Sequence, residues 1–136
     1  MVKNMLDNIK YFRYNENEEA KIMLRQFFEA SIYRWNHWFP EIMWKDPNCV
    51  CVGVSDYQHC ALPEFYDENE PGYFGKNGVM LLIDYPAAEV DSAIYLTNEE
   101  YFSEVSKWAE KYVEDTPEDA EEVAELLEKL KEKFGL

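Results

Sequence analysis

The sequence predicts an α+β fold in which a small, mostly antiparallel sheet packs against several helices. An apolar run at Val79–Ile83 indicates a buried strand, and alternating apolar residues at 90–96 indicate a second one. The connection between them is too short for a parallel crossover and therefore predicts an antiparallel hairpin. A helix follows the hairpin directly. A chain of 136 residues can bury one core without staples, so we expect a single domain over residues 1–136.

The helix after the hairpin begins with a capping box at Thr97-Asn98-Glu99-Glu100. The threonine hydroxyl accepts a hydrogen bond from the amide of Glu100, and the Glu100 carboxylate accepts one from the threonine amide. A stripe of large apolar side chains then recurs at helical spacing and should lie on the sheet. Its members are Tyr101, Phe102, Val105, Trp108, Ala109 and Tyr112.

Three further segments precede the hairpin. Residues 18–38 carry apolar side chains at helical spacing, and Phe39-Pro40 ends this helix because the residue before a proline disfavours helical backbone. Residues 49–55 indicate a long strand whose three valines share one face. Residues 1–17 fit either a helical turn or two, or a short edge strand at 9–14.

The remaining segments are a long loop and a last helix. Residues 56–77 show no clear periodicity and predict a loop, with Asn77-Gly78 as the turn back into the sheet. Thr116 fits an N-cap, Pro117 fits the first helical position, and carboxylates fill the first turn. Gly135 suits the C′ position of the same helix.

Charge is unevenly distributed along the chain. The net charge is −15; residues 1–46 carry seven basic and seven acidic side chains, and the other ninety carry six basic and twenty-one acidic ones. Such a field repels free nucleic acid, whose binding depends on lysine and arginine neutralising phosphates. It attracts a basic protein and accelerates its association. The alternative is that the acidity only keeps a small protein in solution.

Composition also bears on the cellular context. No stretch approaches the roughly 18 apolar residues that a membrane helix needs, and the N-terminus lacks the apolar core of a secretory signal. Three cysteines, an odd number, fit reduced thiols better than a disulfide framework. We therefore expect a cytoplasmic protein with no membrane partner.

Cys49, Cys51, His59 and Cys60 fall within twelve residues and are the candidate metal ligands. Zinc sites normally draw their cysteines from a tight knuckle. Along a strand, the first two thiols are about 7 Å apart, which is too far for an easily shared ion. Cysteine as a small buried apolar residue is the commoner case, so we expect no metal site.

Histidine occurs only at His37 and His59. The first lies among aromatic residues at the end of a helix, and the second precedes a cysteine whose side chain should point away from it. No nucleophile, phosphate-binding or metalloprotease motif occurs. Asp56, Asp84 and Asp91 lie at or in strands, so acid–base chemistry by His59 or by a carboxylate pair is the enzymatic alternative. We expect no enzyme, no catalytic residue and no cofactor.

The 56–75 segment combines acidic and aromatic side chains and contains no lysine or arginine. Aromatic side chains supply contact area at low entropic cost, and acids select a basic partner. The alternative is a surface loop pinned by its aromatic residues, with solvated acids between them. The predicted partner-binding residues are Asp56, Tyr57, Glu64, Phe65, Tyr66, Asp67, Glu68, Glu70 and Tyr73.

A second acidic cluster, at 114–128, holds eight acids and no basic residue. A solvated helix face with favourable charge at its N-terminal end explains this cluster without any partner. We therefore place the docking site on the 56–75 segment and expect the acids at 114–128 mainly to speed encounter.

Two stretches carry a family resemblance: Leu81-Leu82-Ile83-Asp84-Tyr85 and Ala93-Ile94-Tyr95-Leu96-Thr97-Asn98-Glu99-Glu100-Tyr101-Phe102. They resemble the immunity proteins of bacterial contact-dependent growth inhibition (CDI) systems, particularly those paired with ribonuclease toxins. The resemblance covers residues 78–112. It implies a protein that binds the C-terminal nuclease domain of a toxin and blocks its active site or RNA-binding surface. It implies no cofactor and transfers no catalytic residue.

Two binding functions therefore compete. The first is an immunity protein that neutralises one cognate, basic toxin nuclease by tight one-to-one binding. The second is an acidic nucleic-acid mimic that inhibits a DNA- or RNA-binding protein. Both use the same charge, but a mimic should inhibit many basic proteins and an immunity protein only one.

Overall fold

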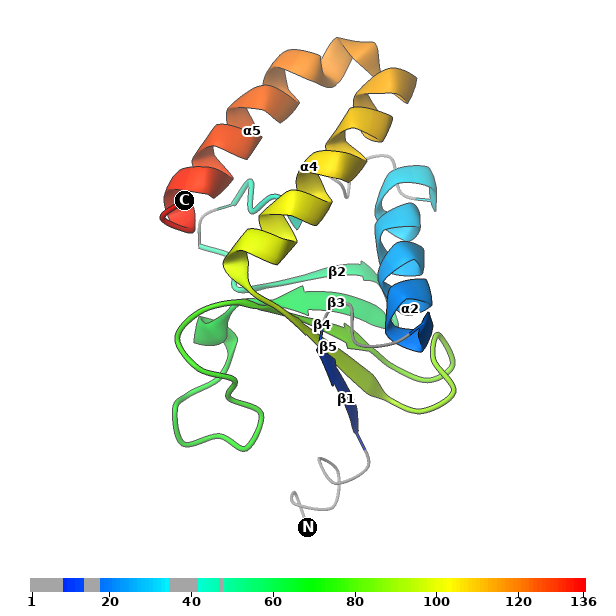
Figure 1. The fold of residues 1–136 in the computed structure, drawn as a ribbon, viewed down its shortest axis with the longest axis vertical. Coiled ribbons are helices and arrows are strands. Elements are labelled where there is room, and N and C mark those ends of the chain that lie inside the picture. The colour runs from blue at the N-terminus through cyan, green and yellow to red at the C-terminus, as the bar shows by residue number, and fades with distance from the viewer. Residues whose placement is uncertain (1–8, 14–17, 35–41, 47) are drawn as a thin grey trace.

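A sheet of five strands organises the structure (Figure 1). The computed structural model describes residues 9–13, 18–34, 42–46 and 48–136. The strands are β1 (Lys10–Arg13), β2 (Cys51–Ser55), β3 (Gln58–Ala61), β4 (Val79–Ile83) and β5 (Ser92–Leu96). Their order in the sheet is β1-β5-β4-β3-β2; β1 is parallel to β5, and the other neighbours are antiparallel. The predicted α+β fold with a mostly antiparallel sheet is confirmed.

Helices cover one face of this sheet. α2 (Glu18–Glu29) continues into a π-helical turn at Ala30–Arg34, and α4 (Asn98–Asp115) follows β5. α5 (Ala120–Lys133) comes after a 3₁₀ turn at Pro117–Asp119 and runs back along α4. In Figure 1, α4 lies between α2 and α5, and ring contacts join α4 to α2 and to the end of α5.

The side chains of each strand alternate between two environments. On β4, Val79, Leu81 and Ile83 belong to the buried core beneath the helices. Alternate side chains point to the opposite side, as strand geometry requires. We call that side the helix-free face, because none of the helices in the described part of the chain covers it. It carries Tyr11, Arg13, His59, Met80, Leu82, Ala93 and Tyr95.

The predicted hairpin is confirmed, with Leu81 of β4 opposite Ile94 of β5. Its second strand begins at Ser92, two residues later than predicted. Val90, the first residue of the predicted strand, is 47% exposed. The chain bends at this position instead, and the Ser92 hydroxyl donates to the carbonyl of Val90 (2.7 Å).

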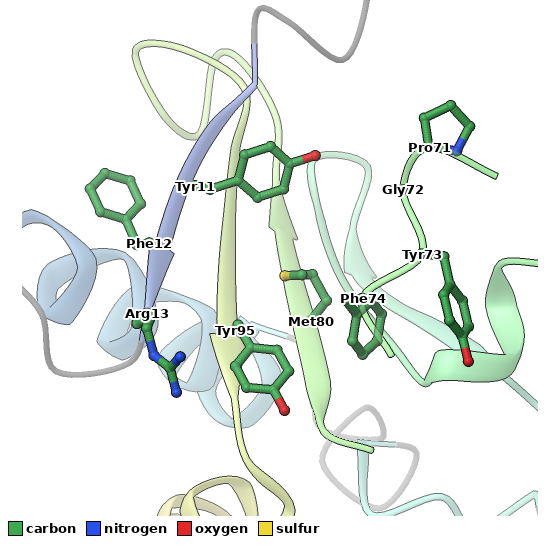
Figure 2. A pocket seen from close by; sticks show the side chains of 9 residues that line it. All are labelled: Tyr11, Phe12, Arg13, Pro71, Gly72, Tyr73, Phe74, Met80 and Tyr95. Carbon is green, nitrogen blue, oxygen red and sulfur yellow. The ribbon is translucent and has the colours of Figure 1, made fainter. Parts of the chain in front are cut away.

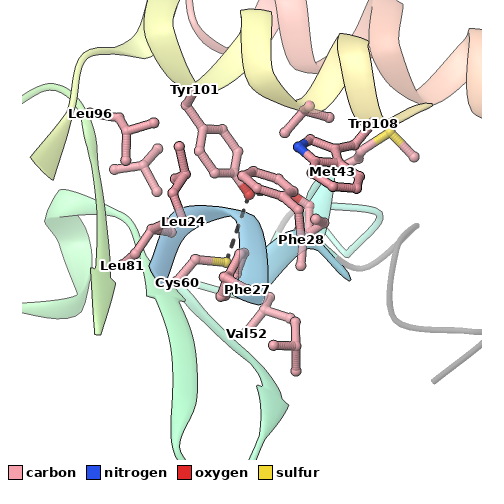
Figure 3. Packing of buried hydrophobic residues seen from close by; sticks show 14 of the residues in the cluster. Leu24, Phe27, Phe28, Met43, Val52, Cys60, Leu81, Leu96, Tyr101 and Trp108 are labelled. Atoms are coloured by element: carbon pink, nitrogen blue, oxygen red, sulfur yellow. Dashed lines mark hydrogen bonds between the residues drawn. The ribbon is translucent and has the colours of Figure 1, made fainter. Parts of the chain in front are cut away.

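The core joins α2 and α4 above the sheet (Figure 3). Phe28 of α2 is fully buried and stacks on Trp108 of α4, with ring centroids 5.9 Å apart and planes within 8°. The Tyr101 hydroxyl donates to the Ile42 carbonyl at 2.8 Å and also lies 3.8 Å from the Cys60 sulfur. This buried phenol therefore has the hydrogen-bond partner that its burial requires.

The capping box of α4 is confirmed. The Glu100 amide donates to Thr97 Oγ1 at 3.1 Å, and the Thr97 amide donates to Glu100 Oε1 at 2.9 Å. The predicted stripe also faces the core. Tyr101, Val105, Trp108, Ala109 and Tyr112 are buried, and Phe102 is half-buried.

The prediction of one continuous loop at 56–77 is wrong, because β3 lies within it. β3 places Gln58 and Cys60 on the core side of the sheet. Gln58 is only 7% exposed, and its side-chain carbonyl accepts a hydrogen bond from the Ser55 hydroxyl (3.0 Å). A polar residue at an inward position hid the alternation by which a strand is recognised.

Three element boundaries also differ from the predictions. The strand predicted at 49–55 begins at Cys51. The helix predicted at 18–38 is observed as α2 and its π-helical turn, and residues 35–41 lie outside the described part of the chain. The last α-helix starts at Ala120 rather than beside Pro117, because a 3₁₀ turn comes first and the Thr116 side chain makes no capping bond.

The C-terminal end of α5 agrees with its prediction. Gly135 has φ +69°, a value that favours glycine at C′. Its amide donates to the Glu132 carbonyl at 3.1 Å, and the Leu136 amide donates to the Lys131 carbonyl at 3.0 Å. These two bonds form a Schellman motif.

The N-terminal strand lies beside the β4–β5 hairpin, and a turn at Asn77-Gly78 leads into it. Of the alternatives for the N-terminal region, the edge strand is observed, as β1 beside β5. The predicted turn at Asn77-Gly78 leads into β4, and Gly78 has φ +100°. A Cβ atom at Gly78 would lie 2.5 Å from the Tyr95 ring, so both the backbone and the packing require glycine here.

Candidate functional site

β3 divides the predicted binding segment into two groups. Asp56 and Tyr57 form the turn between β2 and β3, and the other predicted residues follow β3 from Glu64 onward. Four strand residues separate the two groups by roughly 13 Å. The predicted residues therefore do not lie on one loop, although both groups border the same sheet.

Successive tight turns shape the second group. The Tyr66 amide donates to the Pro63 carbonyl (3.2 Å), which closes a 3₁₀ turn at Pro63–Phe65. The Glu70 amide donates to the Asp67 carbonyl, and the Glu70 carboxylate accepts from the Asp67 amide, both at 2.9 Å. The four acids of this group are solvent-exposed: Glu64, Asp67, Glu68 and Glu70.

A chain of aromatic rings attaches these turns to the sheet. Phe65 and Tyr66 have centroids 4.9 Å apart, Tyr66 and Phe74 6.3 Å, and Phe74 and Tyr95 6.0 Å. Tyr66 also packs against Gly72, where a Cβ atom would come within 2.6 Å of its ring. Tyr66 and Phe74 thus hold the segment in place, whereas Phe65 is 42% exposed and available for contact.

The electrostatic surroundings of Tyr66 show which elements lie near its hydroxyl. Burial raises the pKa of this phenol, and nearby Tyr11, Cys51, Glu70 and Asp84 raise it further. These groups belong to β1, β2, the loop itself and the end of β4. The raised pKa keeps the Tyr66 hydroxyl protonated at neutral pH.

The first group, Asp56 and Tyr57, lies beside residues of the β4–β5 connection that the prediction missed. The Asp84 amide donates to the Tyr57 carbonyl, and the Tyr85 amide donates to Asp91 Oδ1, both at 2.8 Å. Tyr57 is 45% exposed and Tyr85 67%. Tyr85 could have been predicted as a binding residue from the sequence. It lies between Asp84 and Asp91 after a predicted strand, and the predicted binding residues have the same acidic and aromatic composition.

Asp84 provides a stability prediction for this end of the sheet. Burial raises the pKa of its carboxyl, neighbouring Asp91 raises it further, and His59 opposes the shift. The native state then binds more protons than the unfolded state between the ordinary value of 3.8 and the raised one. Stability therefore falls as pH rises through that interval.

We expect Asp84→Asn to raise the melting temperature at pH 7, because the amide carries no charge to desolvate or repel. The advantage over the wild type should vanish below pH 3.8, where the aspartate is protonated in both states. Thermal unfolding followed by circular dichroism between pH 3 and 7 measures this difference. A variant that is less stable at pH 7, or equally favoured at both ends of the range, contradicts the assignment.

A hollow of about 590 Å³ lies between β1 and the loop at 71–74 (Figure 2). The guanidinium carbon of Arg13 lies 5.6 Å from the centroid of the Tyr95 ring. The pairing of β1 with β5 brings Arg13 beside Tyr95, although the two residues are far apart in the sequence. The hollow is lined by Tyr11, Phe12, Arg13, Pro71, Gly72, Tyr73, Phe74, Met80 and Tyr95.

The acids at 114–128 occupy a different part of the molecule, at the junction of α4 and α5. Asp119 accepts a hydrogen bond from the Tyr112 hydroxyl (2.7 Å), and Glu122 pairs with Lys45 at 2.9 Å. These two acids have internal partners, and the exposed residues of the cluster include Glu118, Glu121 and Glu125.

The cysteines and histidines form no metal cluster in the described ranges, where no group of three potential metal ligands is found. Cys60 is fully buried, and burial raises the pKa of its thiol to about 12. The Cys49 thiol donates to the carbonyl of Cys51 at 3.1 Å. His59 is half-buried against Gly53, and the prediction for His37 falls outside the described residues.

Within the described residues, no helix has the length and apolar character needed to cross a membrane. The arrangement as a whole presents acids and aromatic rings around a helix-free sheet face. Such a surface can bind a protein by contact and charge.

Comparisons with known proteins agree with a binding role. No curated protein and no solved structure shows a significant match to the chain. The family described as CDI immunity protein matches residues 23–127, which is most of the chain. The matched region includes β2 to β5, α4 and most of α2 and α5. The chain therefore belongs to the CDI immunity protein family, whose members are non-enzymatic inhibitors of a cognate toxin.

Proposed function

We propose that the protein neutralises a basic toxin nuclease, most simply a ribonuclease, by binding it one-to-one in the cytoplasm. The observation that carries this proposal is that acidic and aromatic side chains border the helix-free face. We further infer that residues 1–136 act as one immunity domain, because one sheet both includes β1 and anchors the aromatic loop through the contact of Phe74 with Tyr95.

Charge supports a nuclease as the target. The net charge of −15 would repel RNA and attract a protein whose own surface is built to bind RNA. A nuclease needs basic residues around its active site to hold phosphates, and these are the groups that exposed carboxylates can pair with. Binding there would cover the active site or the RNA-binding surface of the toxin.

The helix-free face and its borders supply the contact surface. Phe65, Tyr57 and Tyr85 are large apolar side chains that remain at least 42% exposed, beside exposed acids. Burial of such rings in a partner contributes most of the affinity in typical interfaces, and the surrounding charges set specificity. The nine residues predicted from the sequence stay within this proposal, and Tyr11 and Tyr85 join them.

Co-expression tests the function directly. The neighbouring upstream open reading frame is expected to encode the toxin, and its C-terminal domain is produced in a host with and without the chain. We expect growth arrest and degraded cellular RNA without the chain, and normal growth with intact RNA when the chain is present. Purified toxin domain and chain should then co-elute as a one-to-one complex in size-exclusion chromatography.

The same proteins separate this function from nucleic-acid mimicry. A panel of unrelated basic nucleases should remain active in the presence of the chain, whereas a mimic would inhibit several of them. Rescue of growth with intact DNA and RNA in both cultures would show that the toxin is not a nuclease. A neighbouring product that is neither toxic nor bound by the chain would remove the main support for the whole proposal.

A further inference from the structure

The hollow beside β1 is an open depression at the helix-free face. Its volume of about 590 Å³ exceeds that of any single side chain. Met80, only 6% exposed, belongs to the lining of the hollow. In Figure 2, the rings of Tyr11 and Phe74 lie on either side of the Met80 side chain. A cavity of this size is in the range that accommodates a ligand or a bulky side chain with its backbone.

We propose that this hollow receives an aromatic side chain of the toxin, flanked in the toxin sequence by lysine or arginine. The inference rests on the proposed function and specifies which chemical group the toxin inserts. The position would make the hollow an anchor point of the interface, because rings buried in pockets at the centre of a contact surface dominate binding energy.

The lining favours an aromatic group. Tyr11, Tyr73, Phe74 and Tyr95 present rings that can meet an entering ring edge to face or in an offset stack. The Met80 thioether adds a polarisable contact, which is favourable at the edge of an aromatic ring. Pro71 and Gly72 supply further apolar surface without hydrogen-bonding side chains.

The charge differs between the interior of the hollow and its border. Arg13 lies over the Tyr95 ring, so an entering lysine or arginine would meet a like charge. Glu68 and Glu70 come immediately before the lining residue Pro71 and are exposed. A neutral ring therefore suits the interior, and basic neighbours of that ring suit the acidic border.

Tyr11→Ala tests the hollow by affinity. Tyr11 is 54% exposed, so its truncation should leave the fold intact, as thermal unfolding can verify. The dissociation constant for the toxin domain of the neighbouring open reading frame should rise about tenfold or more, measured by isothermal titration calorimetry. Tyr11→Phe keeps the ring and should bind like the wild type.

The Met80 methyl group tests the same contact by position. In ¹³C-methyl-methionine NMR spectra, assigned with a Met80→Leu variant, this signal should move upfield when the toxin binds, because an aromatic ring then lies over it. The core signals of Met23 and Met43 should stay in place. Alanine replacement of one toxin aromatic residue beside a lysine or arginine should abolish the shift.

The outcomes distinguish the two proposals. If the toxin binds but the Met80 signal or the affinity of Tyr11→Ala stays unchanged, the hollow is not the anchor and the immunity function still stands. A shift that survives replacement of every such toxin ring also overturns the inference. If the toxin domain does not bind the wild-type chain, the proposed function fails and the inference fails with it.

Discussion

Replacement of Phe28 by alanine is expected to lower the free energy of unfolding by about 3–5 kcal/mol, the range for a buried phenylalanine. Phe28 is fully buried and contacts three other rings. It meets Phe27 edge to face at 5.3 Å and stacks on Trp108 at 5.9 Å. The loss would be a large part of the roughly 5–15 kcal/mol that stabilises a domain of this size.

The size of this effect follows from what the ring connects. Phe28 belongs to α2, and both Tyr101 and Trp108 belong to α4, so its removal opens a cavity between the two helices that cover the sheet. Neighbouring rings are too rigid to fill such a space fully. The Tyr101 hydroxyl, which bonds to the Ile42 carbonyl, would also lose its packed support.

Urea denaturation followed by tryptophan fluorescence measures the change. Ile22→Ala is the matched control, because Ile22 lies on the same helix but is 45% exposed, and it should cost less than about 1 kcal/mol. If both variants lost the same free energy of unfolding, the packing of Phe28 between α2 and α4 would not be a major source of stability.

The parts of the fold that could be predicted are those in which neighbouring residues determine the structure. Val79–Ile83 is continuously apolar, and Thr97 and Glu100 complete a capping box by their spacing alone. The edge strand at Lys10–Arg13 was one of two alternatives, because its pairing partner β5 is about eighty residues away in the sequence. Such pairing depends on tertiary contacts that no local pattern contains.

β3 was missed for a related reason. Its inward-facing Gln58 is polar, and the hydrogen bond from Ser55 to its side-chain carbonyl offsets the cost of burial. That bond forms only when the β2–β3 turn has formed. A hydrophobicity pattern alone therefore indicates a loop at β3. The turn that brings Ser55 to Gln58 cannot be predicted from alternating apolar and polar residues.

The candidate site was predicted in composition but not in arrangement. Acids and rings from Asp56 to Tyr73 could be identified, because their residue types suit a basic partner. Their division by β3 and their common border on the helix-free face follow from the strand order. The hollow brings Tyr11 beside Phe74 and Tyr95, and these three residues come from separate parts of the chain.

Phe65→Ala is expected to weaken toxin binding by about 2 kcal/mol or more, roughly a 30-fold rise in the dissociation constant. Phe65 is 42% exposed and sits beside the exposed acid Glu64, so a partner can bury it completely. Tyr66 is a poorer test residue, because its ring also fixes the loop to Phe74. The effect should appear mainly as faster dissociation, since buried contacts are lost only when the complex separates.

The acids at 114–128 should act on association instead. Glu118, Glu121 and Glu125 are exposed and belong to a segment without lysine or arginine. Glu122 pairs with Lys45 and should be left intact. Exposed charges are screened within about 10 Å at physiological salt, so they attract a basic partner before contact without holding it afterwards. Replacing these three residues by glutamine should lower the association rate and its salt dependence and leave the dissociation rate nearly unchanged.

Surface plasmon resonance at several salt concentrations separates the two effects, with the toxin domain immobilised. Ile22→Ala, which truncates a similarly exposed apolar side chain on α2, should change neither rate. If the triple glutamine variant dissociates faster while Phe65→Ala binds like the wild type, the toxin docks on the junction of α4 and α5. The aromatic residues of the 56–75 segment would then only hold a surface loop in place. The proposed interface would be on the wrong side of the molecule.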